Sequence, residues 1–400
     1  MTTVDLEDFW PLDPALSENY WPTLEYMRTT CPVHHSNSHG GFWVLTRYDD
    51  VWRVARDYES FINSKGVSAV PFEDSRVRPV PAMADPPFQR SLRVSLDRYF
   101  SPRAVEVFEP YMRRVANELL DTFASNQSCE FMNDFATHYP ARVFFERVLG
   151  LQGADVAQAR VWADAMMMAP HKSASAWDEF GRWAQDLVDR RRAEGPRDPA
   201  EENFVDGLLA ARFEGEPLSD LTLQGAIVNV TLGGLETTAM ALGVIMHHVA
   251  TEPATAAYLA SPDCGRDQLM VAIEEFLRYE TALPTIARVA ARDVEIDGHL
   301  IKEGDRVVLF YGSGNRDEAM FPRAGELVLD RPIEENRHMT FGSGKHRCLG
   351  SNLARAELRV ALEEIFARFS DITLDQPHVA YRNAISRGPV TLRLRFKEQA

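Results

Sequence analysis

Residues 341–350 read FGSGKHRCLG, and this stretch decides how the rest of the chain is interpreted. It is rich in glycine, it presents one cysteine, Cys348, and it is followed by an apolar-periodic segment at 351–368 that predicts a helix. Glycine permits positive φ and lets the backbone lie close to a flat ligand. A helix N-terminus behind a cysteine stabilises a thiolate through its dipole and free N–H groups. The stretch therefore predicts a thiolate presented to a flat ligand, whereas glycines and a cysteine alone would favour a surface turn.

The whole string resembles the haem-binding loop of the cytochrome P450 family at every position that defines that loop. The resemblance implies haem b as the cofactor, with Cys348 as the axial ligand of the iron. It also implies that Phe341, Gly342 and Gly350 lie against the haem. A thiolate ligand pushes electron density to the iron and favours cleavage of the O–O bond. The implied activity is that of a haem-thiolate monooxygenase, which inserts one oxygen atom of O2 into a hydrophobic small molecule.

The composition is that of an ordinary globular protein: of 400 residues, 45% are hydrophobic and 26% are charged. The formal net charge of −16 argues against nucleic acid as a partner, because a protein that neutralises phosphates is basic. The four cysteines are far apart, which argues against a disulfide framework. The acidic segment 1–14 lacks the basic and apolar regions of a signal peptide, and no run reaches the ~18–20 apolar residues of a membrane span. We therefore expect a cytoplasmic protein with no membrane partner.

The clearest helix begins after Ser219, a favourable N-cap, and ends before Pro253. It is apolar on most faces, as is typical of a helix at the centre of a core. Other segments with helical spacing are 47–58, 88–99, 104–124, 155–168, 176–193, 267–279 and 351–368. Strand-like segments are fewer, at 41–46, 294–296, 306–309, 379–385 and 390–396. These patterns predict a mainly α fold with a smaller β part (α+β). The resemblance implies the P450 fold, as one large helical domain over 1–400 with a small β-rich region.

Residues 233–238 of the long helix read GGLETT. Two glycines inside a core helix each cost about 1 kcal/mol relative to alanine. A ligand pressed against the backbone at Gly233, or a local opening of the helix, would account for that cost. The acid and alcohol that follow, Glu236 and Thr237, resemble the oxygen-activation pair of the P450 family. The resemblance implies that Thr237 hydrogen-bonds to the bound dioxygen or its water and that Glu236 relays protons from solvent.

Glu275 and Arg278 are three residues apart and share one helix face, where they can form an ion pair. Alone, such a pair is usually surface decoration. Beside the cysteine loop it resembles the ExxR motif of the family, whose third member is supplied here by Arg331. The resemblance implies a buried structural network near the proximal side of the haem, which serves folding and haem incorporation.

The two haem propionates need cationic or hydrogen-bonding partners. The resemblance points to Arg93, Arg288 and His346. Gln89 stands where many relatives have histidine, and its amide donates a hydrogen bond without carrying charge. Glutamine there, together with the segment GGFWVLTR at 40–47, resembles the camphor-hydroxylating branch of the family.

A substrate pocket is implied on the haem face opposite Cys348. The residues expected to line it are apolar: Val77, Val80, Leu232, Leu283, Ile286 and Ile385. A hydrophobic substrate follows, with hydroxylation or dealkylation as the reaction. Val77 stands where the camphor enzyme has a tyrosine, so an identical substrate is not expected.

Two electrons must come from outside, because no flavin or iron–sulfur domain fits in this chain. The resemblance implies NAD(P)H as their source, through a separate ferredoxin reductase and ferredoxin. Arg90, Arg98, Lys345 and Arg347 flank the cysteine face and form a docking patch, or else are scattered solvated charges. A peroxygenase that uses hydrogen peroxide is one alternative, although such members replace the Glu236–Thr237 pair with an arginine-centred site. A haem gas sensor or carrier is another, and it would need no proton relay.

Overall fold

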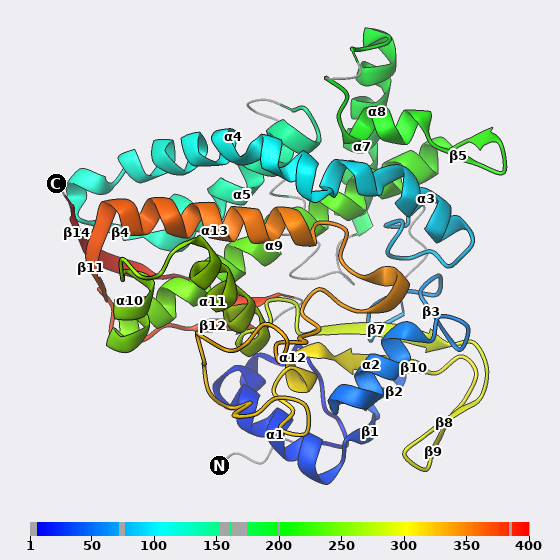
Figure 1. Cartoon of the computed structure of the whole chain (residues 1–400). Coiled ribbons are helices and arrows are strands. Elements are labelled where there is room, and N and C mark those ends of the chain that lie inside the picture. The colour runs from blue at the N-terminus through cyan, green and yellow to red at the C-terminus, as the bar shows by residue number, and fades with distance from the viewer. Residues whose placement is uncertain are drawn as a thin grey trace.

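A computed structural model describes residues 6–71, 77–151, 158, 161, 174–198, 201–383 and 386–399. Helix α9 (Asp220–Thr251) runs through the middle of the molecule, and α13 (Ser351–Arg368) packs against both α9 and α4 (Pro102–Asp121) (Figure 1). The other helices of the described ranges are α1 (Tyr20–Thr30), α2 (Tyr48–Arg56), α3 (Phe88–Leu96), α5 (His138–Val143), α7 (Ala174–Glu194), α8 (Phe204–Ala210), α10 (Pro253–Leu259), α11 (Arg266–Tyr279) and α12 (Tyr311–Gly314).

The largest sheet lies beside the N-terminal helices α1 and α2, and a smaller sheet lies near the C-terminus at the other side of the molecule (Figure 1). The largest sheet has the order β1 (Val33–Ser36), β2 (Phe42–Leu45), β10 (Arg306–Phe310), β7 (Thr285–Ala290) and β3 (Phe61–Ile62). A second sheet has the order β11 (Phe369–Leu374), β14 (Arg393–Glu398) and β4 (Ser128–Glu130). Three hairpins pair β5 (Arg212–Phe213) with β6 (Glu216–Pro217), β8 (Val294–Ile296) with β9 (His299–Ile301), and β12 (Tyr381–Asn383) with β13 (Arg387–Pro389).

Helix α9 forms where the sequence predicts it. The Ser219 hydroxyl accepts a hydrogen bond from the Thr222 backbone N–H at 3.3 Å, and the helix ends two residues before Pro253. The helix is long and apolar enough to cross a membrane, but 72% of its most apolar window is buried inside the protein. It is therefore a core helix, and it fixes the positions of every element that packs against it.

The expected helices are confirmed at 47–58, 88–99, 104–124, 176–193, 267–279 and 351–368, with ends that differ by a few residues. The segment 155–168 lies almost wholly outside the described residues. The single strand expected at 379–385 is wrong in its extent. Strand β12 covers three of those residues, and it pairs with β13 to form a hairpin. This hairpin packs against α9 and carries Arg382 to that helix.

Candidate functional site

The cysteine loop is folded back on itself by backbone hydrogen bonds. The Cys348 N–H donates to the Phe341 carbonyl at 2.7 Å, and the Gly342 N–H donates to the Met339 carbonyl at 2.8 Å. Gly344 has φ +68°, and a Cβ there would meet the backbone carbonyl oxygen of Ala55 in α2 at 2.9 Å. Glycine is thus required both for the turn and for the close approach to α2.

The Cys348 side chain is exposed to a cavity between the loop and α9. Burial raises the pKa of this thiol, while a hydrogen bond from the Gly350 backbone, at the start of α13, acts to lower it. The loop therefore holds a thiol in an apolar setting, with a helix N-terminus placed behind the sulfur. A cation bound at the sulfur would favour the thiolate.

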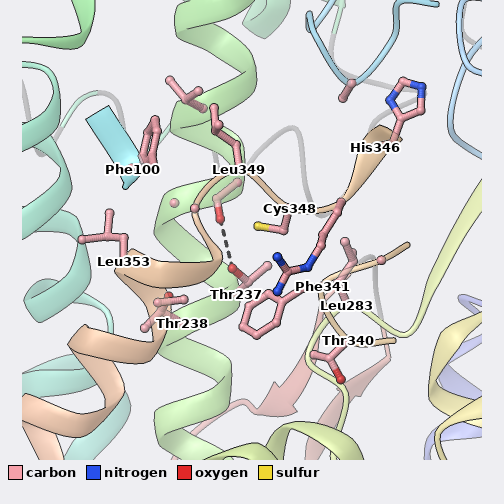
Figure 2. A pocket seen from close by; sticks show the side chains of 18 of the residues that line it. Phe100, Thr237, Thr238, Leu283, Thr340, Phe341, His346, Cys348, Leu349 and Leu353 are labelled. Carbon is pink, nitrogen blue, oxygen red and sulfur yellow. Dashed lines mark hydrogen bonds between the residues drawn. The ribbon is translucent and has the colours of Figure 1, made fainter. Parts of the chain in front are cut away.

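Helix α9 forms the facing wall of the same cavity, and Figure 2 shows Thr237 on that helix and Cys348 on the loop. The Thr237 hydroxyl donates to the Gly233 carbonyl at 3.0 Å. A Cβ at Gly233 would meet nothing within 4 Å, whereas a Cβ at Gly234 would meet the Phe144 ring at 2.8 Å. Gly233 thus leaves the helix backbone bare toward the cavity, and Gly234 admits Phe144. The helix spans Asp220–Thr251 and so runs through both glycines.

Glu236 faces a different cavity. Its carboxylate forms an ion pair with Arg382 of β12, and the residue is 8% exposed. Its second oxygen, Oε2, is buried with no hydrogen-bond partner. Met132, Met240 and Pro389 line this second cavity with the pair. The structure therefore separates the two members of the predicted acid–alcohol pair.

The four predicted propionate partners all line the Cys348 cavity. Arg93 donates to the Arg347 carbonyl at 2.6 Å, and Arg288 donates to the Ala287 carbonyl at 2.8 Å. Gln89 is 1% exposed, and its amide donates to the Lys345 carbonyl at 2.7 Å.

His346 completes this group. Its Nε2 is buried and has no hydrogen-bond partner. Burial, and then the positive charge of Arg288, lower its pKa to about 3. The imidazole is therefore neutral at physiological pH and can donate one hydrogen bond to an anion.

These residues fit haem b. A slot lined by Cys348, Phe341 and bare glycine backbone suits a flat macrocycle with an iron centre, and the two arginines with His346 suit its two acids. The orphaned Nε2 of His346 is a polar atom that a propionate would satisfy. All of the residues predicted to contact the haem line this one cavity: Cys348, Arg93, Arg288, His346, Gln89, Phe341, Gly342, Gly350 and Gly233.

The predicted substrate-pocket residues divide into two groups. Leu283 and Ile286 line the cavity. Val77 and Val80 are buried but are not among its lining residues; Val77 lies where a Cβ on Gly181 would meet it at 2.8 Å. Leu232 packs against the core instead. Ile385 lies outside the described residues.

The Glu275 cluster is buried, as the motif predicts. Arg278 donates to both carboxylate oxygens at 2.8 Å, Arg331 donates to Oε2 at 2.9 Å, and the Val328 N–H donates to Oε1 at 2.8 Å. Burial raises the pKa of Glu275, but these hydrogen bonds outweigh it, so the pKa lies below its ordinary value. Arg278 also donates to three backbone carbonyls of the segment before the cysteine loop. The cluster therefore ties α11 to that segment.

Sequence reasoning missed two buried carboxyl groups. Glu357 of α13 lines the cavity beside Thr238, whose hydroxyl hydrogen-bonds to it, and burial raises its pKa well above the ordinary value. Glu274 accepts from Arg355 at 2.8 Å and from His338 at 2.9 Å. Burial raises the pKa of Glu274, but these partners outweigh it and lower the pKa to about 2. Apolar neighbours at helical spacing on α11 and α13 were the only signal that either glutamate is buried.

The residues of the predicted basic patch differ in their surroundings. Arg90 and Arg347 are exposed. Arg98 forms an ion pair with Glu202 at 3.3 Å, and the Lys345 ammonium lies 3.4 Å from the centre of the Tyr58 ring.

Comparisons with known proteins agree with this geometry. The family model for cytochrome P450 matches residues 164–260 and 268–395. The chain is 32% identical over 380 residues to the putative cytochrome P450 123 of Mycobacterium bovis, covering 92% of both proteins. It is 32% identical over 369 residues to the mycinamicin IV hydroxylase/epoxidase of Micromonospora griseorubida, covering 88% of both. The solved structure of the Bacillus subtilis bacillaene polyketide synthase cytochrome P450 PksS superposes with a TM-score of 0.86 at 27% identity, over 97% of this chain and 100% of that one. The fold thus brings together a loop that carries a thiol, a core helix and side chains that can bind carboxylates. The chain belongs to the cytochrome P450 family of haem-dependent monooxygenases.

Proposed function

We propose that this chain acts in the cytoplasm as a single P450 domain over 1–400, hydroxylating or dealkylating a hydrophobic small molecule. Bound haem supplies the iron that binds and activates dioxygen. The observation that carries the proposal is the placement of the Cys348 thiol and the Thr237 hydroxyl on facing walls of one cavity.

The residues around the cavity have different proposed roles. Cys348 would hold the iron, and Arg93, Arg288, His346 and Gln89 would hold the propionates. Phe341, Gly342, Gly350 and Gly233 present flat or bare surfaces to the ring. The Glu275–Arg278–Arg331 cluster keeps the segment before the loop in place and is structural.

Thr237 would be the group that delivers a proton into the cavity when haem is bound, because its hydroxyl lines the wall of that cavity. Its hydroxyl donates to Gly233 in the resting chain, and a half-turn of its side chain frees that proton for the cavity. Glu236 resupplies the proton from the second cavity, on another side of α9, and this requires Arg382 to release its carboxylate. Arg382 is thus a positioning residue for the relay.

The cavity walls favour an apolar substrate, because Leu283, Ile286, Phe144 and Val230 contribute hydrocarbon surface. Val77, Val80, Leu232 and Ile385 remain proposed contacts of a larger substrate. Electrons come from NAD(P)H through a ferredoxin reductase and a ferredoxin that docks on the cysteine face. The cations of that face are Arg90, Arg98, Lys345 and Arg347, of which the three arginines are exposed.

The test supplies the purified haem-loaded protein with NADPH, a bacterial ferredoxin, its reductase and isotopically labelled dioxygen. Fluorene serves as the apolar probe, because it has one weak benzylic C–H position. The expected product is fluorenol that carries one labelled oxygen atom, seen by mass spectrometry. Product formed only from hydrogen peroxide would replace the proposal with the peroxygenase alternative. Reversible binding of dioxygen without product would favour the gas sensor or carrier.

A further inference from the structure

Asn229 is an unpaired amide on the wall of the haem cavity. It lies on α9, lines the cavity with Val230 and Gly233, and is half-buried. Its side chain makes no hydrogen bond to another residue in the part of the chain that the structure describes. It therefore presents two N–H donors and one carbonyl acceptor toward the cavity.

Three other polar side chains of α9 form hydrogen bonds within the protein. Thr231 donates to the Ile227 carbonyl at 2.7 Å, and Thr237 donates to the Gly233 carbonyl at 3.0 Å. The amide of Gln224, five residues before Asn229, donates to Gln185 at 2.6 Å. The contrast with Gln224 shows that an amide on this helix finds a protein partner where one is available.

Among the residues that the structure describes, no side chain forms a hydrogen bond with Asn229. Pro81, Leu283 and Ile286, which line the same cavity, have no side-chain donor or acceptor. A polar group left without a hydrogen bond in such surroundings is costly, so the amide favours a ligand that can pair with it.

The position of Asn229 also fixes a distance. It is four residues before Gly233 and eight before Thr237, so it lies on the same helix face, about 6 Å and about 12 Å away along the axis. A molecule whose reacting carbon sits beside Thr237 therefore reaches Asn229 with a group about two helical turns away.

We propose that Asn229 is the specificity-determining residue of this cavity. It selects apolar substrates that carry a neutral carbonyl group remote from the oxidised carbon. This inference rests on the proposed function, because it takes the cavity as the substrate site. The Asn229 amide donates to the carbonyl oxygen and so fixes which carbon lies beside Thr237.

Fluorene and fluorenone make a matched pair of probes for the carbonyl contact alone, since they are rigid, nearly identical in shape, and differ by one carbonyl group. Their dissociation constants are measured by calorimetry on the haem-loaded protein, for the wild type and for Asn229→Leu. Leucine matches asparagine in size and removes every hydrogen bond. The preference for fluorenone over fluorene is expected to fall about tenfold in the variant, the size of one hydrogen bond in an apolar site.

Two further variants make the test specific. Gln224→Met removes an amide from the same helix outside the cavity and is expected to leave the preference unchanged. Asn229→Asp keeps the size but loses the N–H donors, so it is expected to lose the preference as well. A preference that is equal in the wild type and Asn229→Leu overturns the role of Asn229 and leaves the proposed function standing. Wild-type protein that binds neither probe overturns both, because the cavity is then no site for apolar molecules.

Discussion

Glu236 and Thr237 are neighbours in the sequence, but their side chains line different cavities. Thr237 faces the cavity of Cys348, and Glu236 faces the cavity of Arg382. Consecutive residues of an α-helix point about 100° apart, so one helix can serve both cavities. Helix α9 is therefore the partition between a buried reaction site and a charged pair that is nearer to the β12–β13 hairpin.

The first prediction concerns Thr237. Thr237→Ala removes the hydroxyl that we propose delivers protons in the cavity, so reducing equivalents are expected to be lost as hydrogen peroxide. We expect product per NAD(P)H to fall several-fold and peroxide per NAD(P)H to rise, with fluorene as the probe. Thr237→Ser keeps the hydroxyl and is the control, with coupling close to that of the wild type. An unchanged peroxide yield in Thr237→Ala would remove Thr237 from the proposed relay.

A second prediction concerns the pair of Glu236 and Arg382. Arg382→Ala leaves the buried carboxylate without its cation, and breaking a buried pair in this way costs about 3–5 kcal/mol of unfolding free energy. Urea unfolding measures this cost. Arg47→Ala is the control, because Arg47 and Asp297 are 44% and 46% exposed and such pairs contribute at most about 1 kcal/mol. An equal loss of unfolding free energy in Arg382→Ala and Arg47→Ala would show that the Glu236 carboxylate is not buried.

The Glu275 cluster gives a third prediction. Arg331→Met removes one of two cations from a carboxylate that is fully buried, and we expect a loss of about 3–5 kcal/mol together with weaker retention of haem. Arg323→Met breaks an exposed pair with Glu326 and is expected to change neither quantity measurably. Haem retention is read from the Soret absorbance after gel filtration. Normal stability in Arg331→Met would contradict the structural role of the cluster.

Much of the site was predictable because its chemistry lies in short local motifs. The cysteine loop, the glycines of α9 and the ExxR pair each carry their meaning within ten residues. The partner of Glu236 was not predictable, since Arg382 is 146 residues away on a hairpin whose strands are only three residues long. The sequence also did not predict β1, β3, β4, β5, β6, β9 and β13, which are two to four residues long and show too few alternations to be distinguished from loops. The six-residue strands β7 and β11 were missed as well.

The two overlooked glutamates yield predictions of opposite sign. Glu357 has a raised pKa, so the folded chain holds its proton more tightly than the unfolded chain does. The stability that this proton supplies is present below the ordinary pKa of about 4.3 and is lost as pH rises toward the folded value. Glu357→Gln cannot ionise and so avoids this loss. Above a pH of about 4.3 we therefore expect the unfolding free energy of the variant to rise relative to that of the wild type, by up to about 1.4 kcal/mol per pH unit. The urea unfolding midpoints of the two proteins, compared over the ~4 pH units from pH 4 to pH 8, measure this difference. A constant difference between the two proteins would contradict a neutral Glu357.

Glu274 behaves in the opposite way. Its pKa is lowered to about 2, so its stabilising effect is present above the ordinary pKa and is lost as pH falls toward about 2. Glu274→Gln is therefore expected to lose stability at neutral pH, and the gap to the wild type is expected to narrow as the solution is acidified below about 4.3. Urea midpoints on both sides of that pH give the measurement. A gap that widens in acid would contradict the pairing with Arg355 and His338.

Ligation of haem iron by Cys348 is the central claim, and the absorbance spectrum of the reduced protein under carbon monoxide tests it most directly. The wild type is expected to show its Soret band at the position that gives the family its name. Cys348→Ala is expected to lose that band, while Cys264→Ala, which changes a cysteine remote from the cavity, is expected to keep it. A well-folded wild type that binds no haem, or whose band stays at the shorter wavelength of a neutral ligand, would contradict thiolate ligation by Cys348.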